Sequence, residues 1–320
     1  MRKLGLWHRI KLALPVAAIA GFGLAPAIAQ TNCANTALAT LSSGTTVTAS
    51  AVYDPFGGTA VNTNMTVTVR NTNNSNCSIA VVFVRTTSPI VMSNGAFSLT
   101  YGLDFNGANA MNIGTPSSGW FTTVGANTTA NFNTFRMTIA ANQTAAAAGS
   151  YSDSQVSLYL YARSGGTWQL VRTYPFTFNA TINKRCTMAA PSPATLNFTS
   201  AITSGRPNAG VILSSLLGSI NCTFPSRITL AGSAMQRTPT IGTVAGFDNF
   251  INWRATATFG SANVTLDTSS LSTVTSSAYN VPSGTTINGS FNANVNMITG
   301  QSLRSGTYTG TLTVTVDPNL

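Results

Sequence analysis

The sequence predicts an all-β protein of two β-sandwich domains, the second of which lacks its final strand. Short runs rich in Val, Thr, Phe and Tyr recur between clusters of Gly, Asn, Pro and Ser, which is typical of strands and turns. The halves also repeat, since GSYSDSQVSLYL at Gly149–Leu160 is matched by GTYTGTLTVTVD at Gly306–Asp317. After the first copy the chain enters another strand-like run, Trp168–Ile182, and after the second it ends at Leu320. We therefore expect the second domain to receive its last strand from another protein.

Residues 1–29 are predicted to be a secretory signal peptide outside the fold. Arg2, Lys3, Arg9 and Lys11 precede the apolar run 12–24, and Ala27-Ile28-Ala29 fits a signal-peptidase site. The apolar run is shorter than the roughly 20 residues that a membrane span needs. We expect an exported protein that begins at Gln30, with an N-terminal domain at 30–182 and a C-terminal domain at 183–320.

Strands are expected nearly throughout both halves. In the first half they are Thr45–Val52, Met65–Arg70, Ile79–Arg85, Phe97–Leu103, Phe132–Ile139, Gln155–Tyr161 and Trp168–Phe178. In the second half they are Thr195–Phe198, Ile228–Leu230, Trp253–Phe259, Phe291–Ile298 and Thr311–Val316. Only two short segments could be helical: Ala145–Ala148, which is Ala-rich, and Val211–Leu217, which fits a strand equally well.

The repeated motif has the alternation of a half-buried strand. In the second half Leu312, Val314 and Val316 share one face, and Thr residues occupy the other. The equivalent inward residues of the first half are Val156, Leu158 and Leu160, with Ser157, Tyr159 and Tyr161 pointing outward.

Composition argues against several classes of function. Removing the signal peptide leaves twelve Lys and Arg against six Asp, a net charge of about +6, with no Glu and no His. The cations are scattered, whereas nucleic-acid binding needs them clustered. A Ser nucleophile would lack a His base, and no two Asp residues lie within ten positions of each other. We expect neither an enzyme nor a metal or other cofactor.

Four cysteines, two in each half, indicate disulfides in an exported protein. Three pairings are possible. One bridge inside each half, Cys33–Cys77 and Cys186–Cys222, is the simplest, and each would contribute roughly 3–4 kcal/mol in the loop-entropy model.

Several features of the chain form one pattern: Tyr53-Asp-Pro-Phe56, the strand Ser98–Leu103, the cysteine near each domain start and the two closing strands at Gly149–Leu160 and Gly306–Val316. In these residues the chain resembles the spore coat protein U domain, the subunit fold of archaic chaperone–usher pili. The second half lacks the Tyr-Asp-Pro-Phe turn and has Gly310 where the first half has Asp153.

The resemblance implies immunoglobulin-like sandwiches, the second completed by strand addition. A periplasmic chaperone would fill the gap first, an outer-membrane usher would assemble the fibre, and the donor strand of the next pilin subunit would replace the chaperone. Only Gln30, Thr31 and Asn32 precede Cys33 after the expected cleavage, about 10 Å of chain and too little to donate a strand. The resemblance therefore implies a tip adhesin at the cell surface, with Leu312, Val314 and Val316 lining the acceptor groove.

The N-terminal domain would then attach the fibre to abiotic or host surfaces and support biofilm formation. If Trp168–Phe178 is its last strand, the loop 163–168 lies about 35 Å from the linker, at roughly 3.3 Å per residue. Apolar residues beside turn formers mark candidate contact loops: Ile90, Val91, Met92, Ile113, Trp120, Phe121 and Trp168. The alternative is that Met92, Trp120 and Phe121 fill the core. Two other functions stay open, a lectin-like receptor domain on the same tip and a secreted, self-associating coat protein.

Overall fold

The computed structural model describes residues 9–11, 33, 39–41, 47–164, 166–188, 195–259, 262–270, 273–275 and 287–318. These residues form strands, with one 3-10 turn, η1 (Thr199–Ala201), and no α-helix among them, so the all-β prediction is confirmed. None of their elements is a helix that could cross a membrane. The chain divides into two compact units: Gly149–Ile182 belongs with the chain up to Gln143, and Thr144–Ala148 with the chain from Asn183.

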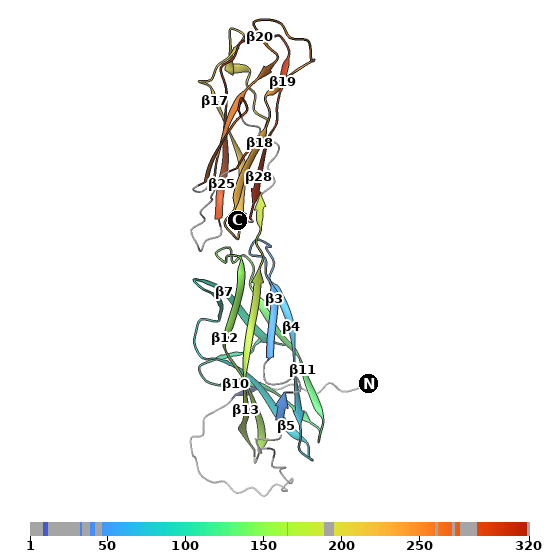
Figure 1. Cartoon of the computed structure of the whole chain (residues 1–320). Coiled ribbons are helices and arrows are strands. Elements are labelled where there is room, and N and C mark those ends of the chain that lie inside the picture. The colour runs from blue at the N-terminus through green and yellow to red at the C-terminus, as the bar shows by residue number, and fades with distance from the viewer. Residues whose placement is uncertain are drawn as a thin grey trace. The chain divides into compact units, whose positions relative to one another are not determined.

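The first unit is a sandwich of two β layers (Figure 1). Its strands are β1 (Arg9–Lys11), β2 (Ala39–Leu41), β3 (Val47–Val52), β4 (Val61–Asn71), β5 (Cys77–Arg85), β6 (Val91–Asn94), β7 (Phe97–Phe105), β8 (Ala108–Asn109), β9 (Met111–Ile113), β10 (Ser118–Val124), β11 (Thr129–Ile139), β12 (Gly149–Ser164) and β13 (Thr167–Ile182). One layer runs β10–β5–β12–β13–β3, and the other runs β7–β11–β4–β2. Strand β6 pairs with both β12 and β7 and so joins the layers.

Aromatic side chains fill the space between the layers. Phe83 on β5 meets Phe135 on β11 with ring centroids 5.0 Å apart, and it meets Phe176 on β13 at the same distance. All three are fully buried. Each such side chain contributes about 1.5–3 kcal/mol on burial, so this cluster is a main source of the unit's stability.

Strand β13 closes the first unit as its last strand. It pairs antiparallel with β12 from Gly149↔Ile182 to Ser164↔Thr167, and its far edge pairs in parallel with β3. The expected inward residues of β12, Val156, Leu158 and Leu160, are at most 1% exposed. The alternation predicted for this strand is confirmed.

The second unit has the same layered plan, but within its described residues no strand pairs with the free edge of β28 as β13 pairs with β12. Its strands are β14 (Cys186–Met188), β15 (Ile202–Thr203), β16 (Arg206–Pro207), β17 (Ile212–Cys222), β18 (Arg227–Gly232), β19 (Met235–Thr238), β20 (Phe247–Asp248), β21 (Phe250–Ile251), β22 (Trp253–Phe259), β23 (Ala262–Asp267), β24 (Thr273–Thr275), β25 (Ile287–Met297), β26 (Ser302–Leu303), β27 (Thr307–Thr309) and β28 (Leu312–Asp317). One layer runs β14–β17–β25–β22–β23, and opposite it lie β24–β18–β28 and β21–β19–β27. The core holds Trp253, whose indole N–H donates to the Ser233 carbonyl at 2.8 Å.

Two local predictions were wrong, and one open alternative is decided. Ala145–Ala148 is not helical, because the residues that precede Gly149 form a turn and irregular chain. Val211–Leu217 takes its strand alternative, in β17. Thr195–Phe198 forms no strand although its residues alternate between exposed and half-buried. A strand needs a hydrogen-bonded neighbour, and this segment has no paired strand within the described part of the chain.

Both predicted disulfides are present, Cys33–Cys77 and Cys186–Cys222. Of the expected signal peptide, only Arg9–Lys11 is described; it pairs as β1 with β10. Cleavage after Ala29 stays a prediction.

Candidate functional site

The open edge of β28 is the first candidate site. Strand β28 pairs antiparallel with β18, from Arg227↔Asp317 to Gly232↔Leu312, and with no other strand of the described chain. Its residues alternate between half-buried and exposed, with Leu312, Val314 and Val316 packed against the margin of the core. The predicted groove residues therefore share one face of an edge strand.

The first unit shows what this position looks like when it is closed. Strand β12 lies beside β5 and β6 as β28 and β27 lie beside β18 and β19. In the first unit β13 covers the other edge of β12. The inward residues of β12 are fully buried, whereas those of β28 are only half-buried. The difference follows from β13, which covers β12 in the first unit, whereas no strand covers this edge of β28 within the described residues of the second.

A second apolar segment borders the same core. Leu196 and Phe198 are half-buried against it, while Thr195 and Asn197 are exposed. In the first unit β13 lies between β12 and β3, so it supplies hydrogen bonds to both. An inserted strand in the second unit would give Thr195–Phe198 the neighbour that its alternation requires.

Two of the predicted contact residues are core residues instead. Met92 is 0% exposed and Trp120 is 4% exposed. The sequence placed both in loops, but Met92 belongs to β6 and Trp120 to β10, where alternation turns them inward. The Trp120 ring packs 5.2 Å from that of Phe105 and 5.9 Å from that of Phe135. Their prediction as contact residues was wrong, because both side chains are buried in the core.

Two other predicted residues come together on the outer face of the β10–β5–β12–β13 layer. The rings of Phe121 on β10 and Trp168 on β13 lie 5.5 Å apart, and both are half-buried. Phe121 pairs with Ala80 of β5. On its other side Ala80 pairs with Tyr161 of β12, and Tyr161 pairs with Leu170 of β13.

This cross-strand row defines an aromatic face made of Phe121, Tyr161, Trp168 and Leu170. Leu170, which the sequence analysis missed, is 49% exposed. Burial raises the pKa of Tyr161, so its hydroxyl stays neutral at ordinary pH. The face is therefore apolar and partly open to solvent, with the exposed Arg163, the cross-strand partner of Trp168, at its margin.

The remaining predicted contact residues lie elsewhere. Ile113 ends β9 and is 42% exposed. Ile90 and Val91 are half-buried beside β7, where Val91 pairs with Thr100. Whether any of these residues contacts a surface stays a prediction.

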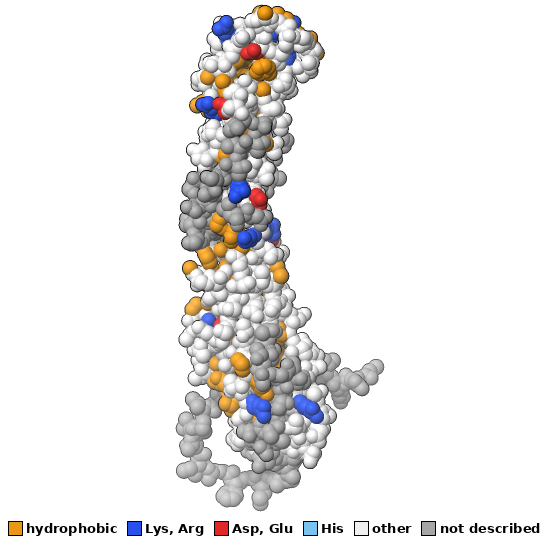
Figure 2. Space-filling view, in the orientation of Figure 1, with side chains coloured by type: hydrophobic (Ala, Val, Ile, Leu, Met, Phe, Trp, Pro, Cys, Tyr) orange, Lys and Arg blue, Asp and Glu red, His pale blue; other side chains and the backbone are white. Residues whose placement is uncertain are grey.

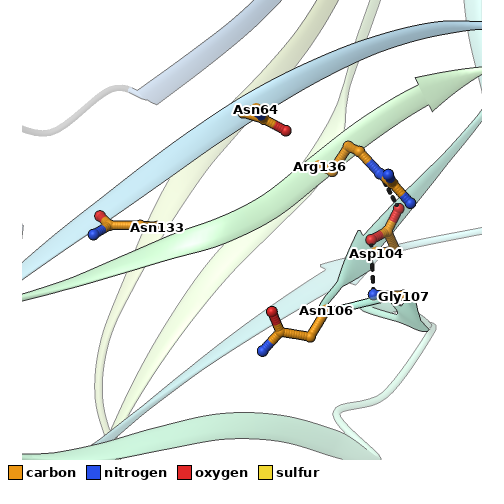
Figure 3. A pocket seen from close by; sticks show the side chains of 6 residues that line it. All are labelled: Asn64, Asp104, Asn106, Gly107, Asn133 and Arg136. Carbon is orange, nitrogen blue, oxygen red and sulfur yellow. Dashed lines mark hydrogen bonds and ion pairs between the residues drawn. The ribbon is translucent and has the colours of Figure 1, made fainter. Parts of the chain in front are cut away.

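A polar hollow of about 320 Å³ lies on the outer face of the opposite layer, over β4, β11 and the turn after β7 (Figure 3). Its lining residues are Asn64, Asp104, Asn106, Gly107, Asn133 and Arg136. Arg136 Nε donates to Asp104 Oδ2 at 2.9 Å, and the Gly107 N–H donates to Asp104 Oδ1 at 3.1 Å. No motif in the sequence pointed to this hollow.

Charged side chains are few and separate on the face drawn in Figure 2, most of which is neutral. No group of three potential metal-ligating side chains occurs among the described residues. The candidate sites are therefore the edge of β28, the aromatic face and the polar hollow, since that face shows no basic patch and the described chain has no metal-binding cluster.

No family model matches the chain, and no curated protein sequence matches it. Among solved structures, 87% of the chain aligns with 99% of a chain in the CsuC–CsuE chaperone–tip adhesion subunit complex from Csu pili of Acinetobacter baumannii, at 12% identity and a TM-score of 0.47. The CfaE adhesin of enterotoxigenic Escherichia coli aligns over 86% of this chain and 92% of its own, at 11% identity and a TM-score of 0.32. The CooA pilin of the same pathogen aligns over 45% of this chain and 97% of its own, at 14% identity and a TM-score of 0.29. Likeness at this level decides neither the fold nor the function of this chain.

Proposed function

We propose that this chain is the tip adhesin subunit of a chaperone–usher pilus. Its second unit receives the donor strand of the next pilin subunit, and its first unit attaches the fibre to an abiotic or host surface and supports biofilm formation. The protein passes through the periplasm, where a chaperone holds the second unit, and an outer-membrane usher places it at the fibre tip.

The open edge of β28 is the single observation that carries the proposal. Leu312, Val314 and Val316 alternate with exposed residues, as the inward residues of a core strand do, but their side chains are only half-buried. The same motif in the first unit is closed by β13. An extended segment that pairs with β28 would form main-chain hydrogen bonds along its edge and cover these three side chains, which is recognition by β-strand addition.

The tip position is supported by the segment before Cys33. Only Gln30–Asn32 separate the expected cleavage site from this cysteine, too short a segment to fill another subunit's groove. The resemblance to spore coat protein U domains stays part of the proposal.

Co-expression of the full chain in a periplasm, with and without its chaperone, tests strand acceptance. A one-to-one complex that forms with the chaperone and exchanges it for a donor-strand peptide supports the proposal. A protease-resistant monomer that purifies without any partner, and that takes up no peptide, refutes it.

Attachment is assigned to the aromatic face of the first unit. Replacing Trp168 and Leu170 together with Ser is expected to reduce attachment to a hydrophobic surface by about tenfold, because tenfold corresponds to about 1.4 kcal/mol and partial burial of two large apolar groups supplies that much. Adhesion of cells to polystyrene measures the effect, with surface display of the subunit checked by antibody.

The matched control is Val52→Ser, which removes an apolar side chain that is 65% exposed on β3 of the same unit. It should leave attachment unchanged. Equal attachment by wild type and the double variant would remove the aromatic face from the proposal.

A further inference from the structure

We propose that the polar hollow on the β7–β11–β4 layer binds a neutral saccharide. The inference deepens the proposed function and rests on the attachment role of the first unit. It does not depend on strand acceptance by the second.

The hollow is built on one cross-strand row. Asn64 of β4 pairs with Arg136 of β11, and Arg136 pairs with Asp104 of β7. All three side chains point to the outer face, because the neighbouring residues Met65 and Phe135 are buried in the core. Three strands of one sheet thus fix the spacing of an amide, a guanidinium and a carboxylate.

Two local irregularities bring in the other side chains. The register of β11 shifts between Phe132 and Phe135, and Asn133 lies in this bulge, outside the regular ladder. Asn106 and Gly107 have φ of 52° and 79° and turn the chain from β7 into β8. Bulges redirect side chains and are common beside binding sites, and a two-residue Asn-Gly turn is the tightest hairpin connection.

The hydrogen-bonding groups of the hollow are largely unused by the described chain. Arg136 donates a hydrogen bond from Nε to Asp104, and its two terminal nitrogens have no partner within the described residues. The same holds for the side-chain amides of Asn64, Asn106 and Asn133 over that part of the chain. By contrast, the side-chain amide of Asn71 donates to the backbone carbonyls of Ser75, Val124 and Gly125. Such an amide stabilises the fold and is not available to a ligand.

The charges of the lining select the class of ligand. Asp104 and Arg136 neutralise each other at 2.9 Å, and no other lining residue is ionisable. An anion would meet the carboxylate and a cation the guanidinium, so neither is favoured. Amides, guanidinium and carboxylate together offer both donors and acceptors, which suits a neutral molecule with many hydroxyl groups.

The size and openness of the hollow fit a short saccharide bound weakly. About 320 Å³ is near the lower end of the roughly 300–1,000 Å³ range of ligand pockets. Arg136 is 45% exposed, so its hydrogen bonds compete with water. We expect a Kd of about 1 mM, equivalent to about −4 kcal/mol, which many tips on one cell would strengthen by multivalency.

The test uses the full chain as it purifies, with or without a partner, and neutral sugars as probes. Mannose, galactose, N-acetylglucosamine and lactose are titrated and followed by ligand-observed NMR, with sialyllactose as the anionic comparison. The variant carries Asn64→Ala, Asn106→Gly and Asn133→Ala. Glycine at 106 keeps the positive φ while removing the amide.

Binding of at least one neutral sugar that weakens by about tenfold or more in the variant supports the inference, since three lost hydrogen bonds at about 0.5–1.5 kcal/mol each exceed 1.4 kcal/mol. The control variant replaces three exposed strand asparagines outside the hollow, Asn131, Asn263 and Asn292, with Ala and should bind like wild type. An unchanged thermal midpoint shows that the hollow variant is folded.

The inference is overturned if no neutral sugar binds, if the hollow variant binds as wild type does, or if sialyllactose binds better than its neutral counterpart. Uptake of a donor-strand peptide is measured on the same preparation. Failure of sugar binding with uptake intact therefore refutes the hollow alone, and sugar binding without uptake supports the hollow while refuting the strand-acceptor role.

Discussion

A donor strand attached in cis is expected to make the second unit stable without a chaperone. The design adds a short Asn-Gly hairpin turn after Leu320, followed by a copy of β13, Thr167–Ile182, which already pairs antiparallel with the equivalent strand of the first unit. The added strand would cover Leu312, Val314 and Val316 and insert its own inward side chains.

The expected gain is large because several apolar groups are buried together. The three aromatic side chains that the copy inserts, Tyr174, Phe176 and Phe178, contribute about 1.5–3 kcal/mol each on burial. Each 1 kcal/mol of net gain would raise the unfolding midpoint of a domain of this size by roughly 4 °C. The fluorescence of Trp253, which is buried in the second unit, reports the transition.

The matched control carries the same turn and strand, with the inward residues of the copy changed to Asn. The inward residues in β13 are Val171, Tyr174, Phe176, Phe178, Ala180 and Ile182. This control should give little gain, because a polar strand cannot fill an apolar groove. Equal stabilisation by both fusions, or a second unit that is equally stable without either, would show that β28 is not an acceptor edge.

The fold class was predictable because its signals are local. Alternation in Gly149–Leu160 and Leu312–Asp317 depends on neighbours two residues apart, and the structure gives the burial that it predicts. The predicted cysteine pairing was also right, helped by the placement of two cysteines in each half. These features need no knowledge of which strands meet.

The errors arose where burial depends on distant strands. Met92 and Trp120 looked like loop residues because Gly and Pro lie nearby in the sequence, yet each joins a short strand whose partners are remote. Thr195–Phe198 shows the opposite error, since it has the pattern of a strand but no paired strand in the part of the chain that the structure describes. Propensity predicts a pleated, half-buried segment, and the sheet decides whether the segment is paired.

The polar hollow could not be found from sequence for the same reason. Asn64, Asp104 and Arg136 lie far apart along the chain and meet only through the registers of β4, β7 and β11. Asn is frequent everywhere in this protein, so no single amide stood out. Register is a property of the whole sheet, and a slip of one residue would send these side chains to the core face.

The second large effect is expected at a buried ion pair in the first unit. Arg85 Nε donates to Asp153 Oδ2 at 2.6 Å, and the two side chains are only 5% and 1% exposed. The Tyr101 hydroxyl donates to the same oxygen at 2.9 Å, and the backbone N–H of Gln155 donates to Oδ1 at 3.0 Å. Burial, together with the Asp153 charge, raises the pKa of Tyr101 well above its usual value, so this hydroxyl remains a donor.

Asp153→Ala should destabilise the first unit by about 3–5 kcal/mol, because it leaves the Arg85 guanidinium buried without a counter-ion. Chemical unfolding followed by the fluorescence of Trp120 measures the loss, and Asp104→Ala is the matched control. That change breaks an ion pair in the same unit whose Arg136 side chain is 45% exposed, so it should cost less than about 1 kcal/mol.

A further variant separates charge from packing. Replacing Arg85 with Met and Asp153 with Leu together removes both charges while keeping apolar volume, and it should restore much of the stability that Asp153→Ala loses. Equal costs for Asp153→Ala and Asp104→Ala would mean that the buried pair is solvated after all. The second unit has Gly310 at the matching position of its motif. The pair therefore belongs to the closed unit, where β13 helps to exclude water from β12, and an edge strand open to solvent gives a carboxylate no comparable burial.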